Sequence, residues 1–214
     1  MEGALCTPTE PEFRLIETFG WHPGEGFRHL KRHLARMQRS ARAFDLPFAQ
    51  SKANTALADP QSETPLRCRL AMDRAGNFEL TTARLGPTAP LWRVAIAKTR
   101  LDEADPFLHH KTTRRALYDQ TRAALPAGAD EALFLNNRGE VAEGTITNIF
   151  VETQSGERLT PPLESGVLPG ILRERLLETE GYAEAVLQIE DLTRARAVYM
   201  GNALRGLIPV QLQT

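Results

Sequence analysis

The chain has 214 residues, of which 42% are apolar and 25% charged, so it can bury a core as one unit or as two small lobes. Its net charge is −1, which argues against nucleic acid or an anionic membrane as a partner. No apolar run approaches the roughly 20 residues that cross a bilayer, and no basic-then-apolar leader is present. Cys6 and Cys68 form no motif and are expected to be free thiols. We therefore expect a cytoplasmic protein.

The first 86 residues are expected to form an α+β lobe. After a Pro/Gly turn, apolar residues recur at helical spacing between Phe27 and Ala41, with basic residues between them, which predicts an amphipathic helix. Two alternating segments flank a turn and predict a hairpin. A linker follows over 87–90. The expected elements are a strand over 13–19, a helix over 27–41, a weaker helix over 49–58, and strands over 66–72 and 78–83.

The second lobe is expected to cover residues 91–214. Short apolar and β-branched runs alternate with helical patterns, and Pro161-Pro162 breaks the chain between them. The expected elements are strands over 92–97, 131–135, 146–152, 186–189, 198–200 and 207–212, and helices over 112–124 and 169–178.

Lys111 directly precedes the helix expected over 112–124, the first helix of the second lobe. The helix dipole and any burial disfavour the charged form of a lysine there, and a neutral amine is what an aldehyde cofactor requires. The alternative is an ordinary solvated surface lysine. The neighbouring His109 and His110 lack a third ligand at suitable spacing, so no metal site is expected.

Two further segments have the chemistry of a cofactor site. Pro169-Gly170 begins a helical pattern, which exposes backbone N–H groups suited to phosphate, although many helices begin this way. Glu143 precedes a predicted strand, where its carboxylate could pair with a pyridinium nitrogen or could be a solvated turn residue. Asn202 follows a strand end, and Arg205 nearby could equally be a surface cation.

The order and the sequences of these segments resemble the class IV, fold-type IV pyridoxal-phosphate family. The resemblance begins near Phe13 and covers nearly the whole chain, and within the family the wording is most similar to aminodeoxychorismate lyase-like proteins. Residues 6–12 lack the longer N-terminal segment that is usual in the family. The matching stretches are Leu15-Ile16-Glu17-Thr18, His33-Leu34-Ala35-Arg36-Met37, His110-Lys111-Thr112, Glu131-Ala132-Leu133-Phe134-Leu135, residues 143–150, Thr160-Pro161-Pro162, Leu168-Pro169-Gly170-Ile171-Leu172-Arg173 and Asn202-Ala203-Leu204.

The resemblance implies a two-lobe, D-amino-acid aminotransferase-like fold, with an α+β lobe and a pseudo-barrel lobe that binds pyridoxal 5'-phosphate. It implies that Lys111 bonds covalently to the cofactor and acts as acid and base, and that Glu143 pairs with the ring nitrogen. Further roles carried over from the family are phosphate binding by Arg36 and the N–H groups of Ile171 and Leu172, and positions near the cofactor or substrate for Asn148, Thr18, Asn202, Ala203 and Arg205.

The activity implied is conversion of 4-amino-4-deoxychorismate to 4-aminobenzoate and pyruvate, a step towards folate. The alternative is an amino-acid aminotransferase that prefers branched-chain or D-amino acids. A third hypothesis is a non-catalytic homologue that binds ligands or a partner, although such a protein would not need Lys111 and Glu143. The partners implied are a small amino substrate, a second copy of the chain in a homodimer, and an aminodeoxychorismate synthase subunit.

Overall fold

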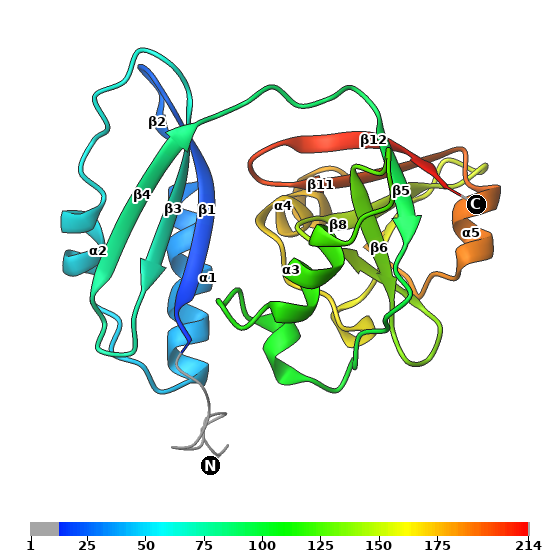
Figure 1. Cartoon of the computed structure of the whole chain (residues 1–214), viewed down its shortest axis with the longest axis horizontal. Helices are drawn as coiled ribbons and strands as arrows, with labels where there is room; N and C mark the ends of the chain where they lie inside the picture. The colour runs from blue at the N-terminus through cyan, green and yellow to red at the C-terminus, as the bar shows by residue number, and fades with distance from the viewer. Residues whose placement is uncertain (1–12, 214) are drawn as a thin grey trace. The chain divides into compact units, whose positions relative to one another are not determined.

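The computed structural model describes residues 13–213, which divide into two compact units (Figure 1). Of the described residues, unit 1 comprises 13–87 and 110–114, and unit 2 comprises 88–109 and 115–213. The sequence placed residues 110–114 in the second lobe, whereas they pack with the first unit. Thr112 forms a β-bridge with Leu15, so this segment continues the edge of the first sheet. Cys6 lies outside the described residues.

Unit 1 is a four-stranded antiparallel sheet with two helices. The strand order is β2-β1-β3-β4, and the predicted hairpin is confirmed as β3 and β4. The buried free thiol of Cys68 lies in β3. The elements are β1 (Leu15–His22), β2 (Gly26–Phe27), α1 (Leu30–Ala43), α2 (Gln50–Ala56), β3 (Leu66–Met72) and β4 (Phe78–Arg84).

Helix α1 is amphipathic, as the spacing of its apolar residues predicted. Leu34, Met37 and Ala41 are buried, which provides the apolar contact that stabilises a helix of this length. Three polar side chains of α1 are also buried, namely His33, Arg36 and Ser40. Burying polar groups is costly unless they are hydrogen-bonded, so these three side chains are expected to have partners within unit 1.

Unit 2 contains a six-stranded closed sheet. The strands follow the order β8-β11-β12-β5-β6-β7, and β7 pairs back to β8 through Glu143 and Asn148. Strands β9 and β10 extend the sheet beyond β8. The strands are β5 (Trp92–Ile96), β6 (Glu131–Leu135), β7 (Val141–Gly144), β8 (Asn148–Glu152), β9 (Arg158–Thr160), β10 (Tyr182–Glu184), β11 (Ala197–Asn202) and β12 (Gly206–Leu212).

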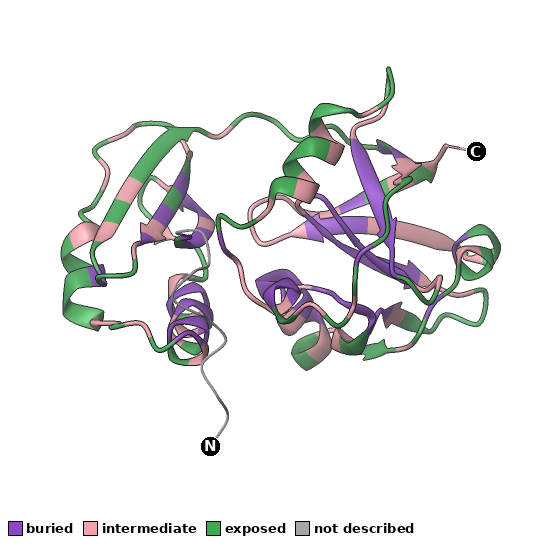
Figure 2. Ribbon diagram, turned by 60° about the horizontal axis from the view of Figure 1, so that its bottom comes forward, coloured by how far each residue is buried: buried purple, intermediate pink, exposed green. Residues whose placement is uncertain are grey.

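Alternate residues of the six strands form the main core of unit 2. They include Val94, Leu133, Val141, Ile149 and Met200, all fully buried, and Figure 2 shows buried stretches within the strands of this unit. Closing the sheet gives every one of these strands two neighbours, so no backbone edge is left open between them. The helices of unit 2 are α3 (Ala116–Ala123), α4 (Ile171–Thr179) and α5 (Ile189–Arg194), with single 3-10 turns at Pro106–His109 and Leu163–Ser165.

The structure corrects several of the predicted elements of unit 2. The helix expected from residue 112 begins at Ala116, because the backbone of Lys111 and Thr113 hydrogen-bonds to Ile16 and Arg14 instead. The strand expected over 186–189 is wrong, since α5 begins at Ile189 with a capping box formed by Gln188 and Asp191. Strands β7, β9 and β10 have only three or four residues each, too few for their period to be read.

Within residues 13–213, every helix is too short or too polar to span a lipid bilayer.

Candidate active site

Glu143 lies in β7 and is 5% exposed, which excludes the alternative of a solvated turn residue. Its Oε1 accepts a hydrogen bond of 2.8 Å from the Tyr118 hydroxyl. Its Oε2 accepts bonds of 3.2 Å from Asn148 Nδ2 and 2.9 Å from the Leu168 N–H. Three donors from three different segments therefore hold one buried carboxylate in a fixed orientation.

Asn148 connects this carboxylate to the start of α4. Its Nδ2 also donates to the Leu168 carbonyl at 3.0 Å, so the amide bridges β8 and the turn that precedes the helix. Gly170 is the residue just before α4, and a Cβ there would overlap Asn148 Oδ1. Only glycine lets the backbone approach so closely. No side chain of the described residues caps α4, which leaves the N–H groups of its first turn for a ligand or water.

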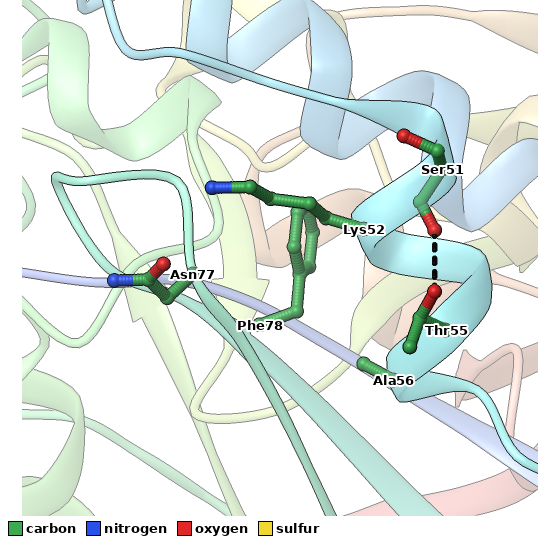
Figure 3. A pocket seen from close by; sticks show the side chains of 6 residues that line it. All are labelled: Ser51, Lys52, Thr55, Ala56, Asn77 and Phe78. Atoms are coloured by element: carbon green, nitrogen blue, oxygen red, sulfur yellow. Dashed lines mark hydrogen bonds between the residues drawn. The ribbon is translucent and has the colours of Figure 1, made fainter.

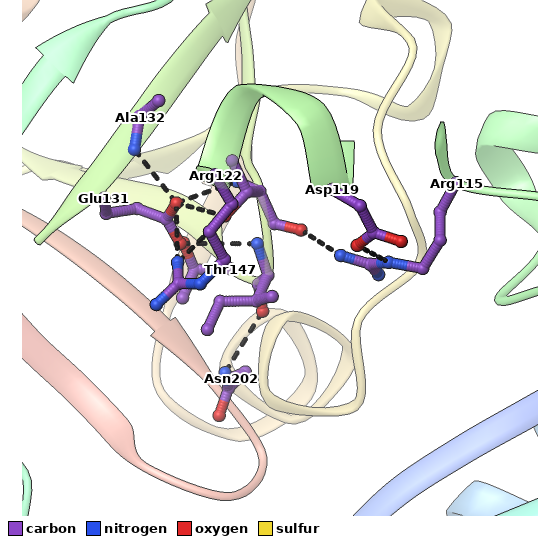
Figure 4. Close-up of polar contacts among 9 residues, drawn as sticks. Arg115, Asp119, Arg122, Glu131, Ala132, Thr147 and Asn202 are labelled. Carbon is purple, nitrogen blue, oxygen red and sulfur yellow. Dashed lines mark hydrogen bonds and ion pairs between the residues drawn. The ribbon is translucent and has the colours of Figure 1, made fainter. Parts of the chain in front are cut away.

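Glu131, at the start of β6, organises the turn between β7 and β8. Its side chain is fully buried and accepts bonds from the Thr145 and Ile146 N–H groups at 3.1 and 3.3 Å, and from both threonine hydroxyls of the turn. Arg122 Nη1 lies 3.3 Å from Oε1 (Figure 4). Since this turn connects Glu143 to Asn148, the Glu131 carboxylate fixes the geometry of both.

Unit 1 contains a second buried polar cluster, centred on Glu17 of β1. Both Glu17 oxygens bind Arg36, at 2.8 Å to Nε and 2.6 Å to Nη2, and Oε2 also lies 2.6 Å from His33 Nδ1. Burial alone would raise the pKa of Glu17, but the charges and hydrogen bonds of Arg36 and His33 outweigh it and lower the pKa to about 2. Glu17 therefore stays ionised and holds the Arg36 guanidinium through two parallel bonds.

Lys111 does not lie at a helix start, so the dipole argument for a neutral lysine is wrong: α3 begins at Ala116. The backbone of the segment is instead fixed against β1, where the Ile16 N–H donates to the Lys111 carbonyl at 2.9 Å. His110 Nδ1 lies 3.0 Å from the hydroxyl of Ser40, one helical turn from Arg36 on α1. Helix α1 thus connects Arg36 to the segment that carries Lys111.

Comparison with known proteins identifies the family of the chain. The sequence profile of the family described as Amino-transferase class IV matches residues 14–212, almost the whole chain. The chain belongs to this family. It is therefore a pyridoxal-phosphate-dependent enzyme, and the family resemblance seen in the sequence is confirmed.

Three relatives of this class IV enzyme illustrate the range of the family. A Schizosaccharomyces pombe protein named "Putative aminodeoxychorismate lyase" is 29% identical over 204 residues, covering 91% of this chain and 87% of the relative. A Mesorhizobium loti structure titled "Putative amino-acid aminotransferase" is 41% identical with a TM-score of 0.90, covering 94% of this chain and 100% of that one. A PLP-bound hypothetical aminotransferase from Mycobacterium tuberculosis, 20% identical with a TM-score of 0.79, covers 94% and 81%.

The residues of this class IV enzyme fit pyridoxal phosphate. Glu143 supplies a buried, hydrogen-bonded carboxylate of the kind that can hold a protonated ring nitrogen. The start of α4 supplies backbone N–H groups and the close approach that Gly170 permits, which suit a phosphate. Lys111 supplies a primary amine on a segment whose backbone is fixed by β1.

The remaining predicted residues of the enzyme lie in several places. Asn202 donates to the Ile146 carbonyl at 3.1 Å and accepts from the Leu204 and Arg205 N–H groups at 3.0 Å each, so it ties the β11–β12 turn, which includes Ala203, to the turn held by Glu131. The Arg205 side chain reaches Thr88 at 3.1 Å. Thr18 is half-buried in β1 of unit 1.

Sequence reasoning gave no role to Tyr118, Glu131 or Glu17. Glu131 and Glu17 fall inside the matched stretches, and an acidic residue within an otherwise apolar strand was the signal that could have found them. A shallow hollow of about 370 Å³ in unit 1, lined by exposed and partly buried residues of α2 and the start of β4, contains none of the predicted site residues (Figure 3). It is lined by Ser51, Lys52, Thr55, Ala56, Asn77 and Phe78.

Proposed function

We propose that this class IV enzyme is a lyase that converts 4-amino-4-deoxychorismate into 4-aminobenzoate and pyruvate. The observation that carries the proposal is the match to the S. pombe relative of that name, which extends over most of both chains. The sequence around Lys111 and after Asn202, which is most similar to lyase-like proteins, agrees with the proposed lyase activity.

The bound cofactor would supply an electron sink that stabilises negative charge on the amine-bearing carbon of the substrate. Lys111 would hold the cofactor covalently in the resting enzyme. Once the substrate's amine has displaced it, the freed Lys111 amine would take the proton from that carbon. Glu143 would keep the ring nitrogen protonated. The pyruvyl ether bond breaks next, its oxygen leaves with pyruvate, and the carbon skeleton left behind becomes aromatic.

Binding is proposed to depend on residues from several elements. Arg36 and the N–H groups of Ile171 and Leu172 would bind the phosphate, because two charge-assisted bonds to Glu17 orient the guanidinium and α4 begins with uncapped N–H groups. Residues proposed to lie near the cofactor or substrate are Asn148, Thr18, Asn202, Ala203 and Arg205. A homodimer, and association with a synthase subunit, belong to the same proposal.

The decisive experiment mixes the purified protein with pyridoxal phosphate and 4-amino-4-deoxychorismate, without any keto acid, and follows the release of 4-aminobenzoate and pyruvate. We expect equal amounts of the two products. The Lys111→Ala variant lacks both the covalent anchor and the base, so we expect it to lose at least about a thousandfold in turnover. A protein that binds the cofactor but releases neither product would rule out the lyase.

An amino-acid aminotransferase is the second candidate, and the 41% identity to the M. loti structure with that title favours it. An aminotransferase requires a keto acid to accept the amino group and works in ping-pong order, whereas a lyase requires no acceptor. Branched-chain and D-amino acids with 2-oxoglutarate or pyruvate are the substrates to screen. Turnover that depends strictly on the keto acid would establish this alternative.

A further inference from the structure

Tyr118 approaches the Glu143 carboxylate from α3. Its hydroxyl donates a 2.8 Å hydrogen bond to Oε1, the oxygen opposite the one that Asn148 and Leu168 bind. The contact joins α3 to β7 through two residues that are 25 positions apart in the sequence. This tyrosine lies outside the stretches that match the family motifs.

Packing fixes the Tyr118 ring, so the hydroxyl has a defined position. The ring lies edge-on to Phe134 with centroids 5.2 Å apart, against the cluster that contains Leu101, Leu108 and Val167. The guanidinium of Arg115, the residue just before α3, lies 5.6 Å from the ring centroid. Both the phenol and the carboxylate that form this hydrogen bond are therefore fixed in position.

Tyr118 remains a proton donor throughout the pH range in which the protein would be assayed. Burial raises the pKa of the phenol well above its ordinary value, and the negative charge and hydrogen bond of Glu143 raise it further. A neutral phenol beside a carboxylate can only donate. The bond therefore stabilises the ionised form of Glu143 and lowers its affinity for a proton.

We propose that Tyr118 is a positioning residue for the cofactor ring: by donating to Glu143, it keeps the carboxylate ionised so that the proton between Glu143 and the ring nitrogen stays on the ring. This inference rests on the proposed role of Glu143. Without the phenol, the carboxylate would hold the proton more tightly, and the ring would be a weaker electron sink. The hydrogen bond from Tyr118 stabilises the negative charge of Glu143, whereas the bonds of Asn148 and Leu168 hold β7 in position.

The test is Tyr118→Phe in the cofactor-loaded enzyme, because this change removes the hydroxyl and keeps the ring that packs on Phe134. We expect kcat to fall about tenfold with KM changed less than about threefold, which corresponds to one lost charge-assisted bond. We also expect the pH titration of the bound cofactor's absorption to shift. The matched control is Tyr182→Phe, a buried tyrosine of unit 2 that packs on Phe150. It should leave kcat and spectrum unchanged.

A double-mutant cycle with Glu143→Gln separates the possible outcomes. If Tyr118 acts through Glu143, Tyr118→Phe should cause no further spectral shift in the Glu143→Gln background. An unchanged spectrum and kcat in Tyr118→Phe, beside a shifted spectrum in Glu143→Gln, would overturn the inference alone. An unchanged spectrum in Glu143→Gln would overturn the proposed role of Glu143 as well. Loss of thermal stability in Tyr118→Phe without a spectral shift would assign a purely structural role and also contradict the inference.

Discussion

At the scale of single residues, three buried carboxylates organise the polar interior of this enzyme. Glu17, Glu131 and Glu143 are each at most 5% exposed, and each is surrounded by hydrogen-bond donors. A buried charge without such partners would cost several kcal/mol. Each carboxylate therefore fixes the backbone or the cation that it binds, and removing its charge should have effects beyond its own position.

Because of Glu17, the free energy of unfolding should depend on pH in the acid range. Its pKa is lowered from 4.5 to about 2 in the folded protein, so its contribution is complete above about pH 4.5 and is lost as the pH falls to about 2. We expect Glu17→Gln to be less stable than the wild type at pH 7, and the difference to shrink at low pH by up to about 3 kcal/mol.

The measurement is urea unfolding of both proteins between pH 7 and pH 2. Glu140 also has a pKa lowered to about 2, mainly by its hydrogen bond from Arg138, but it is present in both proteins and cancels in the difference. Glu190→Gln, an exposed residue of α5, is the control. A stability difference for Glu17→Gln that does not change with pH would show that the ion pair does not contribute in this way.

At the scale of elements, the β7–β8 hairpin depends on a residue of β6. Glu131→Gln would place an amide N–H₂ against the donors of the turn over residues 145–147. We expect a loss of about 3 kcal/mol in the free energy of unfolding, because several buried donors lose their acceptor. Thermal and urea unfolding would measure it, again with Glu190→Gln as the control. A loss below about 1 kcal/mol would mean that the turn is stabilised mainly by its neighbours.

The start of α4 offers a second test. Gly170 has φ −68° and ψ 142°, which alanine adopts readily, so any defect in Gly170→Ala must come from its Cβ overlapping Asn148 Oδ1. We expect Asn148 to move and affinity for pyridoxal phosphate to fall at least about tenfold, measured by absorbance titration. Gly86→Ala, where a Cβ would meet nothing within 4 Å, is the control. Equal cofactor affinity in both variants would show that this close approach does not matter.

Elements were predicted well where their period is long enough to read. β3 (Leu66–Met72) and β6 (Glu131–Leu135) agree with the predicted bounds residue for residue, and α1 has the predicted buried stripe. β7 was missed because Val141, Ala142, Glu143 and Gly144 are all buried and show no alternation. The start of α3 was placed too early because only the pairing of Thr112 with Leu15 prevents a helix there.

At the scale of the whole molecule, stability should be unevenly distributed. β6 and β7 are buried at every position, whereas α2 has Ala53 as its single buried residue. We expect amide hydrogen exchange to be slowest in β6, β8 and β11 of the closed sheet, and faster by several orders of magnitude in α2. Mass spectrometry of the exchanging protein would measure this. Equal protection of α2 and β6 would contradict it.

The sequence by itself determined the family, the cofactor and the candidate residues, because Lys111, Glu143 and the Pro169-Gly170 start of α4 lie in ordered motifs that can be read one after another. Only the tertiary structure decided how these residues are held. Tyr118, Glu131 and Glu17 bind groups 14 to 25 residues away, through hydrogen bonds with no local period. Spacing along the chain records which side chains share a face, whereas the partners of a buried charge depend on the closed sheet and on the packing of helices against strands.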